Sequence, residues 1–483
     1  MSLRGQAVSG VKWLGSSTGI TAVLAMGQMV VMSHLLEPRD LGLLAMVWAV
    51  LGFAQALADM GLGNAIVQRR DLPVEVMSTI YWTTLGVGVA LALLSFGAAP
   101  WIAGYYREPE MTPMVRWAGV SLVVVALGQP YRFLAQRELR FPLMAKADAG
   151  AAVVQFALAT ALAVAGAGPY SLLFGGMAGH LWRLLLLGGG QWRHWLPGLR
   201  WQAADLRDIW SFGALQMADR ITNYFWSNID YVLIGRYYGA GPLGLYRQAY
   251  ETVVRPLETV NPVVNAVAFP LYARKQDDDA ALRRGFLEVL DLLATLVFPL
   301  LAGLAAVAPE AIRTLYGEKW AGAVPLLYIL APLGILRSLL NPVVAVLLAK
   351  GMAGRVLLLN LSLAVVTPAA IWAALPLGLE RVAVAETLSL AAVIVVSWPW
   401  LYARTFGLRA GDYLRTLARP ALLSAVMAAV VWLTARGMEG WGLATGARLG
   451  ILVVLGAGIY GGAHMLFFRE YVRRLRDTVL RRG

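Results

Sequence analysis

Long apolar runs recur along the whole of this chain, and they restrict its fold more than any other feature. A helix needs roughly 20 consecutive apolar residues to cross the hydrocarbon of a bilayer, which is about 30 Å thick. Fourteen such runs lie near residues 13–36, 42–66, 76–101, 114–135, 144–167, 169–190, 209–237, 244–271, 285–308, 322–349, 356–377, 382–403, 417–435 and 446–468. We therefore predict an all-α integral membrane protein of about fourteen transmembrane helices.

The composition agrees with this class. Of the 483 residues, 59% are hydrophobic and 14% are charged, whereas soluble domains carry about 25% charged residues. The net charge of +13 comes from short loops between apolar runs, so it favours contact with anionic lipid and not with nucleic acid. Cysteine is absent, which excludes disulfides and thiolate metal sites.

The distribution of Lys and Arg predicts an orientation. With the N-terminus inside, 28 of these residues fall on the inner side and 10 on the outer side, and three lie within apolar runs. Inner loops of membrane proteins are enriched in Lys and Arg. We therefore expect a multi-pass protein of the inner (plasma) membrane, with a retained first span and both termini in the cytoplasm.

A short internal repeat predicts two similar halves. Residues Leu41–Leu44 after the first run (LGLL) resemble residues Leu243–Tyr246 after the seventh (LGLY). Six runs separate the copies, so both keep the same orientation in the membrane, as in a parallel repeat. We predict an N-terminal lobe at 1–207, a C-terminal lobe at 208–404, and two extra spans with a basic cytoplasmic tail at 405–483.

Patterns typical of enzymes are not found in the sequence. There is no Gly-x-x-x-x-Gly-Lys-Ser/Thr phosphate loop, and the four His residues have no metal-ligand spacing. The acidic run Asp277-Asp278-Asp279 lies in a short basic loop, which favours a solvated loop over a metal site. We expect a protein that is not an enzyme and that has no resident metal or cofactor.

Charged residues inside apolar runs are the strongest functional feature. An ionised side chain at the bilayer centre costs at least about 2.5–3.5 kcal/mol, so it usually faces a partner or water. In the eighth run Arg247, Glu251, Arg255 and Glu258 have helical spacing that places all four on one face, and their charges sum to zero. Two interpretations stay open. The stripe neutralises itself, or it lines a cavity in which Arg receives an anion such as a diphosphate.

Several stretches resemble a known family. They are residues 35–42 and 59–68 in the first two runs, and residues 228–236, 239–240, 243–246 and 249–250 in the seventh and eighth. In these stretches the chain is similar to Wzx-type lipid-linked oligosaccharide flippases, nearest the colanic-acid-exporter-like branch. Those proteins belong to the multidrug/oligosaccharidyl-lipid/polysaccharide exporter superfamily, which also holds multidrug and toxin extrusion transporters and the lipid II flippase.

The resemblance implies two pseudo-symmetric six-helix lobes around a central cavity, plus two C-terminal helices. It implies movement of undecaprenyl-diphosphate-linked oligosaccharide from the cytoplasmic to the outer leaflet by alternating access, for surface polysaccharide biosynthesis. The expected diphosphate ligands are Arg220, Arg255 and Arg337. The expected cavity or ion-coupling carboxylates, with H⁺ or Na⁺ as the coupled ion, are Asp59, Asp148, Asp219, Asp230, Glu251 and Glu258.

Two other functions compete with this one. A cation-coupled multidrug antiporter of the same superfamily predicts an acidic cavity, which the Arg residues in the runs disfavour. A membrane glycosyltransferase or ligase needs a large outer loop, whereas the longest one here, near 308–321, is short. We expect a monomer that contacts membrane lipids and the polysaccharide polymerase and chain-length machinery.

Overall fold

The computed structural model describes residues 3–58, 73–192, 195–273, 278–438 and 440–467. Fourteen helices of 20 residues or more occur in these ranges: α1 (Leu3–Leu35), α2 (Pro38–Ala58), α4 (Val74–Tyr106), α5 (Met111–Arg137), α6 (Phe141–Val164), α7 (Tyr170–Gln191), α8 (Ala204–Tyr238), α9 (Ala240–Ala273), α10 (Asp279–Ala306), α12 (Val324–Ala349), α13 (Ala353–Ala374), α14 (Leu379–Trp398), α16 (Ala410–Gly437) and α17 (Thr445–Phe467). Shorter elements are α11 (Ala308–Leu315), η1 (Glu318–Ala323), η2 (Leu375–Leu377), η3 (Pro399–Ala403) and α15 (Arg404–Phe406). The predicted all-α class is confirmed.

Twelve of the long helices are apolar enough over the described residues to cross a membrane. The two exceptions are α8 and α9, which correspond to the seventh and eighth apolar runs. Both are long enough to span a bilayer, but charged residues such as Asp230 and Arg255 lower their hydropathy. The chain is therefore a multi-span membrane protein, and the two long helices that fall below this apolar threshold follow one another.

The chain divides into two compact units, residues 1–247 and 248–483. The lobe boundary expected at 207/208 differs from this division, which falls within the second turn of α9. The reason is packing: α8 lies against α2 and α4, so it belongs with the first unit. The prediction of a separate third segment from residue 405 also differs from this division, because α16 packs on α10 inside the second unit.

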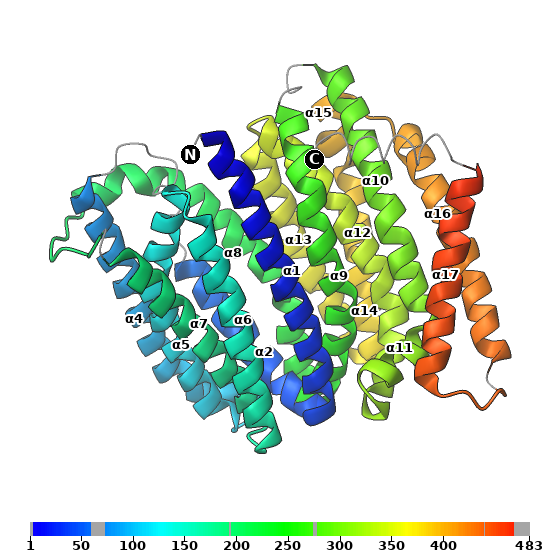
Figure 1. Cartoon of the computed structure of the whole chain (residues 1–483), viewed down its shortest axis with the longest axis horizontal. Coiled ribbons are helices and arrows are strands. Elements are labelled where there is room, and N and C mark those ends of the chain that lie inside the picture. The colour runs from blue at the N-terminus through cyan, green and yellow to red at the C-terminus, as the bar shows by residue number, and fades with distance from the viewer. Residues whose placement is uncertain (1–2, 59–72, 193–194, 274–277, 439, 468–483) are drawn as a thin grey trace. The chain divides into compact units, whose positions relative to one another are not determined.

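In the first unit, small residues bring helices close together. Helices α6 and α7 are neighbours, and α1 lies on α6 (Figure 1). A Cβ atom added at Gly175 would lie 2.7 Å from the Cβ of Ala159, and one added at Gly179 would lie 3.2 Å from the oxygen of Ala151. This Gly-x-x-x-Gly spacing places both glycines on one face of α7, as in tightly packed membrane helices.

The two copies of the repeat pack against each other within the first unit. A Cβ at Gly42 would lie 1.7 Å from the carbonyl oxygen of Ala240, and one at Gly244 would lie 1.7 Å from that of Pro38. Each glycine thus meets the residue four positions before the other, so the contact has an approximate two-fold symmetry. Side chains at either position would clash with backbone, which explains why glycine stands in both copies.

In the second unit, α10 packs on α12 and α16, and α12 on α14. Asp278 caps α10, accepting hydrogen bonds from the backbone nitrogens of Ala280 and Ala281 at 2.9 Å. Asp279 pairs with the Lys350 Nζ at 2.6 Å. Two residues of the acidic run therefore organise a helix start, a structural role that Asp and Asn commonly take.

Candidate functional site

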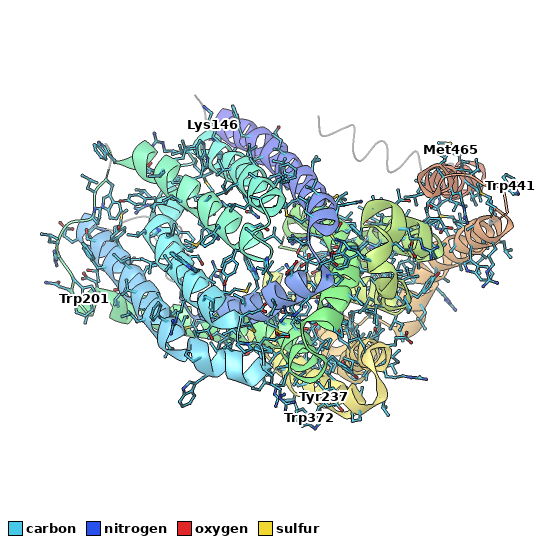
Figure 2. The ribbon with its side chains drawn as sticks, turned by 90° about the horizontal axis from the view of Figure 1, so that it is seen from below. Lys146, Trp201, Tyr237, Trp372, Trp441 and Met465 are labelled. Atoms are coloured by element: carbon cyan, nitrogen blue, oxygen red, sulfur yellow. The ribbon has the colours of Figure 1, made fainter. Side chains whose placement is uncertain are left out.

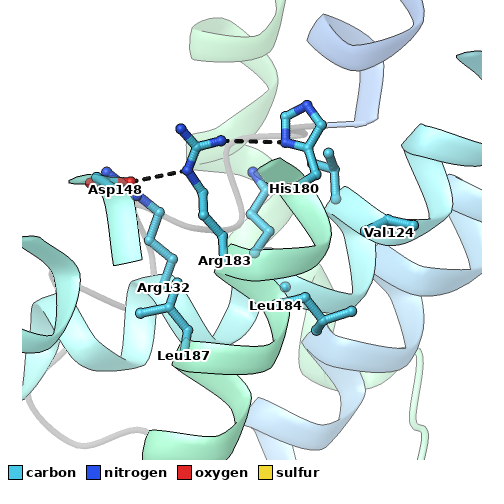
Figure 3. Close-up of a pocket in the computed structure, with 10 residues that line it drawn as sticks. Val124, Arg132, Asp148, His180, Arg183, Leu184 and Leu187 are labelled. Atoms are coloured by element: carbon cyan, nitrogen blue, oxygen red, sulfur yellow. Dashed lines mark hydrogen bonds and ion pairs between the residues drawn. The ribbon is translucent and has the colours of Figure 1, made fainter. Parts of the chain in front are cut away.

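A cavity of about 330 Å³ lies between α5, α6 and α7 in the first unit, and a cluster of charged side chains lines part of its largely apolar wall. The Asp148 Oδ1 accepts a hydrogen bond from the Arg132 Nη1 at 2.7 Å and another from the Arg183 Nε at 3.1 Å. Figure 3 shows Arg183 between this carboxylate and His180. One carboxylate oxygen therefore holds two guanidinium groups in one cavity.

Helix geometry brings these residues together from three elements. Arg132 lies in the last turns of α5 and Asp148 in the second turn of α6, and the short link between these antiparallel helices makes them neighbours. His180 and Arg183 are three residues apart on α7, so they share a face. The close α6–α7 packing through Gly175 and Gly179 then brings that face up to Asp148.

The cavity wall carries more positive than negative charge. Two guanidiniums face one carboxylate, and the side chains of Arg132 and Arg183 are 41% and 32% exposed. A guanidinium has five N–H donors, so each arginine has donors beyond those that contact Asp148. Such an arrangement can bind an oxyanion, because guanidinium matches phosphate or carboxylate oxygens in a bidentate manner.

His180, one of the four His residues without metal-ligand spacing, lies in the cavity wall. Its Nδ1 lies 3.5 Å from the Arg183 Nη1, at the long limit of a hydrogen bond. It also lines a smaller hollow that Trp48, Gln55 and Ser121 border. Since a guanidinium only donates, the Nδ1 is the acceptor, and the ring is neutral in this geometry.

The predicted stripe on α9 pairs with itself. The Arg255 Nε lies 2.6 Å from the Glu251 Oε2, and its Nη1 lies 3.2 Å from the Glu258 Oε2. The prediction that these three residues share a face is confirmed. Both carboxylates contact the one guanidinium between them. The geometry of the stripe matches the self-neutralising interpretation.

Arg337 is held in the interior of the second unit. Its Nη2 contacts the Glu386 Oε1 on α14 at 3.1 Å, and its Nη1 donates to the hydroxyl of Tyr250 on α9. The Glu386 side chain is 3% exposed and that of Arg337 is 19% exposed. Next to it, the Ser338 Oγ donates to the Asn261 Oδ1 at 2.8 Å. These contacts join α9, α12 and α14.

The remaining predicted residues lie on α8 or outside the described part of the chain. On α8, Asp230 is buried, Asp219 is half-buried and Arg220 is exposed. Asp59 lies outside the described residues. Within the second unit Arg255 and Arg337 contact different carboxylates. The roles proposed for all these residues in binding or ion coupling stay predictions.

Sequence reasoning missed Arg132 and Arg183 as site residues. Both were assigned to inner loops, because each lies near the end of an apolar run. In the structure both belong to helices, and they converge on Asp148, which was among the predicted carboxylates. The spacing of His180 and Arg183 on one helix face was the signal that could have identified them.

Comparison with known proteins identifies a family and several relatives. The profile of a family described as polysaccharide biosynthesis protein matches residues 31–325. The chain is 32% identical to the teichuronic acid biosynthesis protein TuaB of Bacillus subtilis (strain 168), over 100% of this chain and 99% of that one. It is 31% identical to the lipopolysaccharide biosynthesis protein WzxC of Escherichia coli (strain K12), over 72% of this chain and 71% of that one.

Solved structures share the fold. The lipid II flippase MurJ, in an inward closed conformation, matches with a TM-score of 0.77 and 11% identity, over 95% of this chain and 99% of that chain. An inward-facing multidrug resistance transporter of the MATE family and MOP superfamily matches with a TM-score of 0.64 and 16% identity, over 80% of this chain and 94% of that chain. By its family match, its full-length relative and its fold, this chain belongs to the polysaccharide biosynthesis protein family and has the architecture of MurJ and the MATE transporters.

Proposed function

We propose that this protein is a flippase that moves an undecaprenyl-diphosphate-linked oligosaccharide from the cytoplasmic to the outer leaflet of the plasma membrane by alternating access. The relatives support a role in surface polysaccharide biosynthesis, since one is named for teichuronic acid and another for lipopolysaccharide. The fold shared with a lipid II flippase supports a lipid-linked substrate.

Moving such a lipid across the membrane requires a polar path for its headgroup. A headgroup of diphosphate and sugars cannot cross hydrocarbon unaided, because its polar groups would lose water without replacement. A protein that solves this problem needs a polar, cationic surface within a membrane-spanning bundle. The cavity of Arg132, Asp148 and Arg183 has that property, and it is the structural observation that carries the proposal.

In this proposal the diphosphate binds the two arginines, and Asp148 holds them in place when the substrate is absent. Both guanidiniums are partly exposed to the cavity, so an oxyanion can reach them without breaking the Asp148 contacts. Arg255 and Arg337 are less suited to this role, since carboxylates already neutralise them. The polyprenyl tail stays in the surrounding lipid.

The bias of basic residues supports cytoplasmic termini in this proposal. The cavity then lies toward the cytoplasmic end of the bundle, at the α5–α6 link, where the substrate would enter. In this proposal, transport is coupled to H⁺ or Na⁺, and the protein contacts the polysaccharide polymerase machinery. The proteins that share the fold are a lipid II flippase and a multidrug transporter, which favours transport over glycosyl transfer.

Reconstitution tests the proposal directly. Proteoliposomes are loaded with a fluorescent undecaprenyl-diphosphate oligosaccharide, and the fraction that changes leaflet is measured by quenching from outside. Wild type should move the lipid much faster than empty liposomes. Arg183→Ala should reduce the rate about tenfold, since one charge-assisted hydrogen bond is worth roughly 1.5–3 kcal/mol. The matched control is Arg200→Ala, an exposed loop arginine, and its rate should stay at the wild-type level. A wild-type rate equal to that of empty liposomes refutes the function.

A further inference from the structure

A second cationic cavity lies in the other unit, where the extra helix pair α16–α17 meets α11. Its volume is about 300 Å³, and its walls come from α10, α11, α12, α16 and α17. Three arginines line it, from three different helices: Arg313, Arg436 and Arg448. Among the described residues of the lining, Glu310 is the single carboxylate. The described wall of this cavity therefore has an excess of positive charge.

The deepest arginine has a structural role. The Arg448 Nη2 contacts the Glu310 Oε1 at 3.0 Å and the carbonyl oxygen of Ala435 at 3.0 Å. Both charged side chains are largely buried. This pair fixes the start of α17 against α11 and the end of α16. In it, Arg448 neutralises the carboxylate of Glu310.

The two other arginines are available to a ligand. The Arg436 guanidinium stacks on the Trp432 ring, 3.8 Å from its centroid, and among the described residues no carboxylate forms an ion pair with it. Arg313 contacts Glu318, but both side chains are at least half exposed. An exposed pair of this kind contributes little, about 0–1 kcal/mol, so an incoming anion can compete for Arg313.

The surroundings place this cavity at the level of a membrane interface. Trp441 in the turn between α16 and α17 is 68% exposed and points away from the helices (Figure 2). Trp432 and Tyr328 lie in the cavity wall itself. Trp and Tyr concentrate where hydrocarbon meets lipid headgroups. A guanidinium cluster at that level lies at the depth of lipid phosphates.

From this arrangement we propose that the cavity between α11, α16 and α17 binds the phosphate of a membrane lipid, with Arg436 and Arg313 as its ligands and Arg448 as the residue that fixes their frame. The cation–π contact with the Trp432 ring restrains the Arg436 guanidinium, whose N–H groups can form bidentate contacts with phosphate oxygens. Two lipids present this chemistry: a bulk anionic phospholipid, and a prenyl phosphate of the kind that carries the proposed substrate. The second source rests on the proposed function, whereas the first does not.

Binding measurements on purified protein in a neutral detergent test this site without a transport assay. Native mass spectrometry compares phosphatidylglycerol, farnesyl phosphate and diacylglycerol, which lacks the phosphate. Wild type should bind at least one of the phosphate lipids about tenfold more tightly than diacylglycerol. Arg436→Gln should weaken that binding about tenfold, and the double variant Arg313→Gln/Arg436→Gln should abolish the preference for phosphate.

The control is Arg381→Gln, which removes an exposed arginine from the first turn of α14. It should bind like wild type, and all variants should melt at the wild-type temperature, since Arg448 and Glu310 are intact. Tighter binding of phosphatidylglycerol assigns the site to bulk lipid, and tighter binding of farnesyl phosphate assigns it to the prenyl carrier. Equal binding of all three lipids by wild type, or an Arg313→Gln/Arg436→Gln variant that binds like wild type, overturns the proposal whether or not the protein is a flippase.

Discussion

Arginine is used in opposite ways in the α5–α7 cavity of the first unit and on α9 and α12 of the second. In the α5–α7 cavity two guanidiniums share one oxygen of Asp148, so positive charge is left over. On α9 two carboxylates surround Arg255, and in the interior Glu386 and Tyr250 hold Arg337. The presence of arginine in a membrane helix does not by itself indicate an anion site. The number of carboxylates for each guanidinium distinguishes an arginine that can bind an anion from one that stabilises the fold.

Burial adds a second difference. Removing one partner from a buried ion pair leaves an uncompensated charge and costs about 3–5 kcal/mol, whereas an exposed pair contributes about 0–1 kcal/mol. Glu386 is 3% exposed, and the Arg255 side chain is 40% exposed. The comparison thus predicts where substitutions change stability and where they change transport.

The largest effect is expected from Glu386→Gln. The buried Arg337 would lose its carboxylate, and the free energy of unfolding should fall by about 3 kcal/mol. Chemical unfolding in detergent, followed by tryptophan fluorescence, measures this change. The control is Arg337→Met/Glu386→Leu, which removes both charges and should recover most of the stability. A Glu386→Gln variant as stable as wild type would show that Arg337 is not a structural residue.

The double variant Arg132→Ala/Arg183→Ala should show the largest loss of transport. Both guanidiniums of the cavity disappear, and the rate of lipid movement in proteoliposomes should fall by more than the roughly tenfold loss of Arg183→Ala. Because both arginines contact Asp148, the two single effects are coupled and do not simply add. The unfolding free energy should also fall by about 1–2 kcal/mol, because Asp148, 19% exposed, would lose both arginine partners. Unchanged transport would remove the cavity from the proposed mechanism.

Asp148→Asn sharpens the role of the carboxylate in the cavity. The excess positive charge would rise, so inorganic diphosphate should bind several-fold more tightly in isothermal titration calorimetry. The two arginines would lose their shared anchor, and the unfolding free energy should fall by about 1–2 kcal/mol. Weaker diphosphate binding would indicate that holding the arginines in place matters more than the added charge.

The smallest effect is expected from Arg255→Gln. The exposed α9 pairs contribute about 0.5 kcal/mol or less, and the transport rate should stay within about twofold of wild type. The same proteoliposome assay measures it beside Arg183→Ala. If Arg255→Gln instead loses transport to the extent of Arg183→Ala, the diphosphate site moves to α9, as the sequence pattern predicted.

The sequence by itself determined the class of fold. Apolar runs of about 20 residues predict membrane helices, because hydrocarbon demands that each backbone polar group be satisfied within its own helix. The same rule located the long helices and marked the charged pair α8 and α9 as unusual. Spacing along a helix is fixed at 3.6 residues per turn, so the shared face of Glu251, Arg255 and Glu258 was also predictable.

Only the tertiary structure decided which charges meet across helices. Arg132, Asp148 and Arg183 come from three helices, and their contact depends on the close approach of α6 and α7 through Gly175 and Gly179. The LGL repeat likewise predicted two copies of a motif, but packing showed that Gly42 and Gly244 pair with one another's helix starts. Periodicity describes one helix at a time, whereas side-chain packing between helices selects the partners of each charged group.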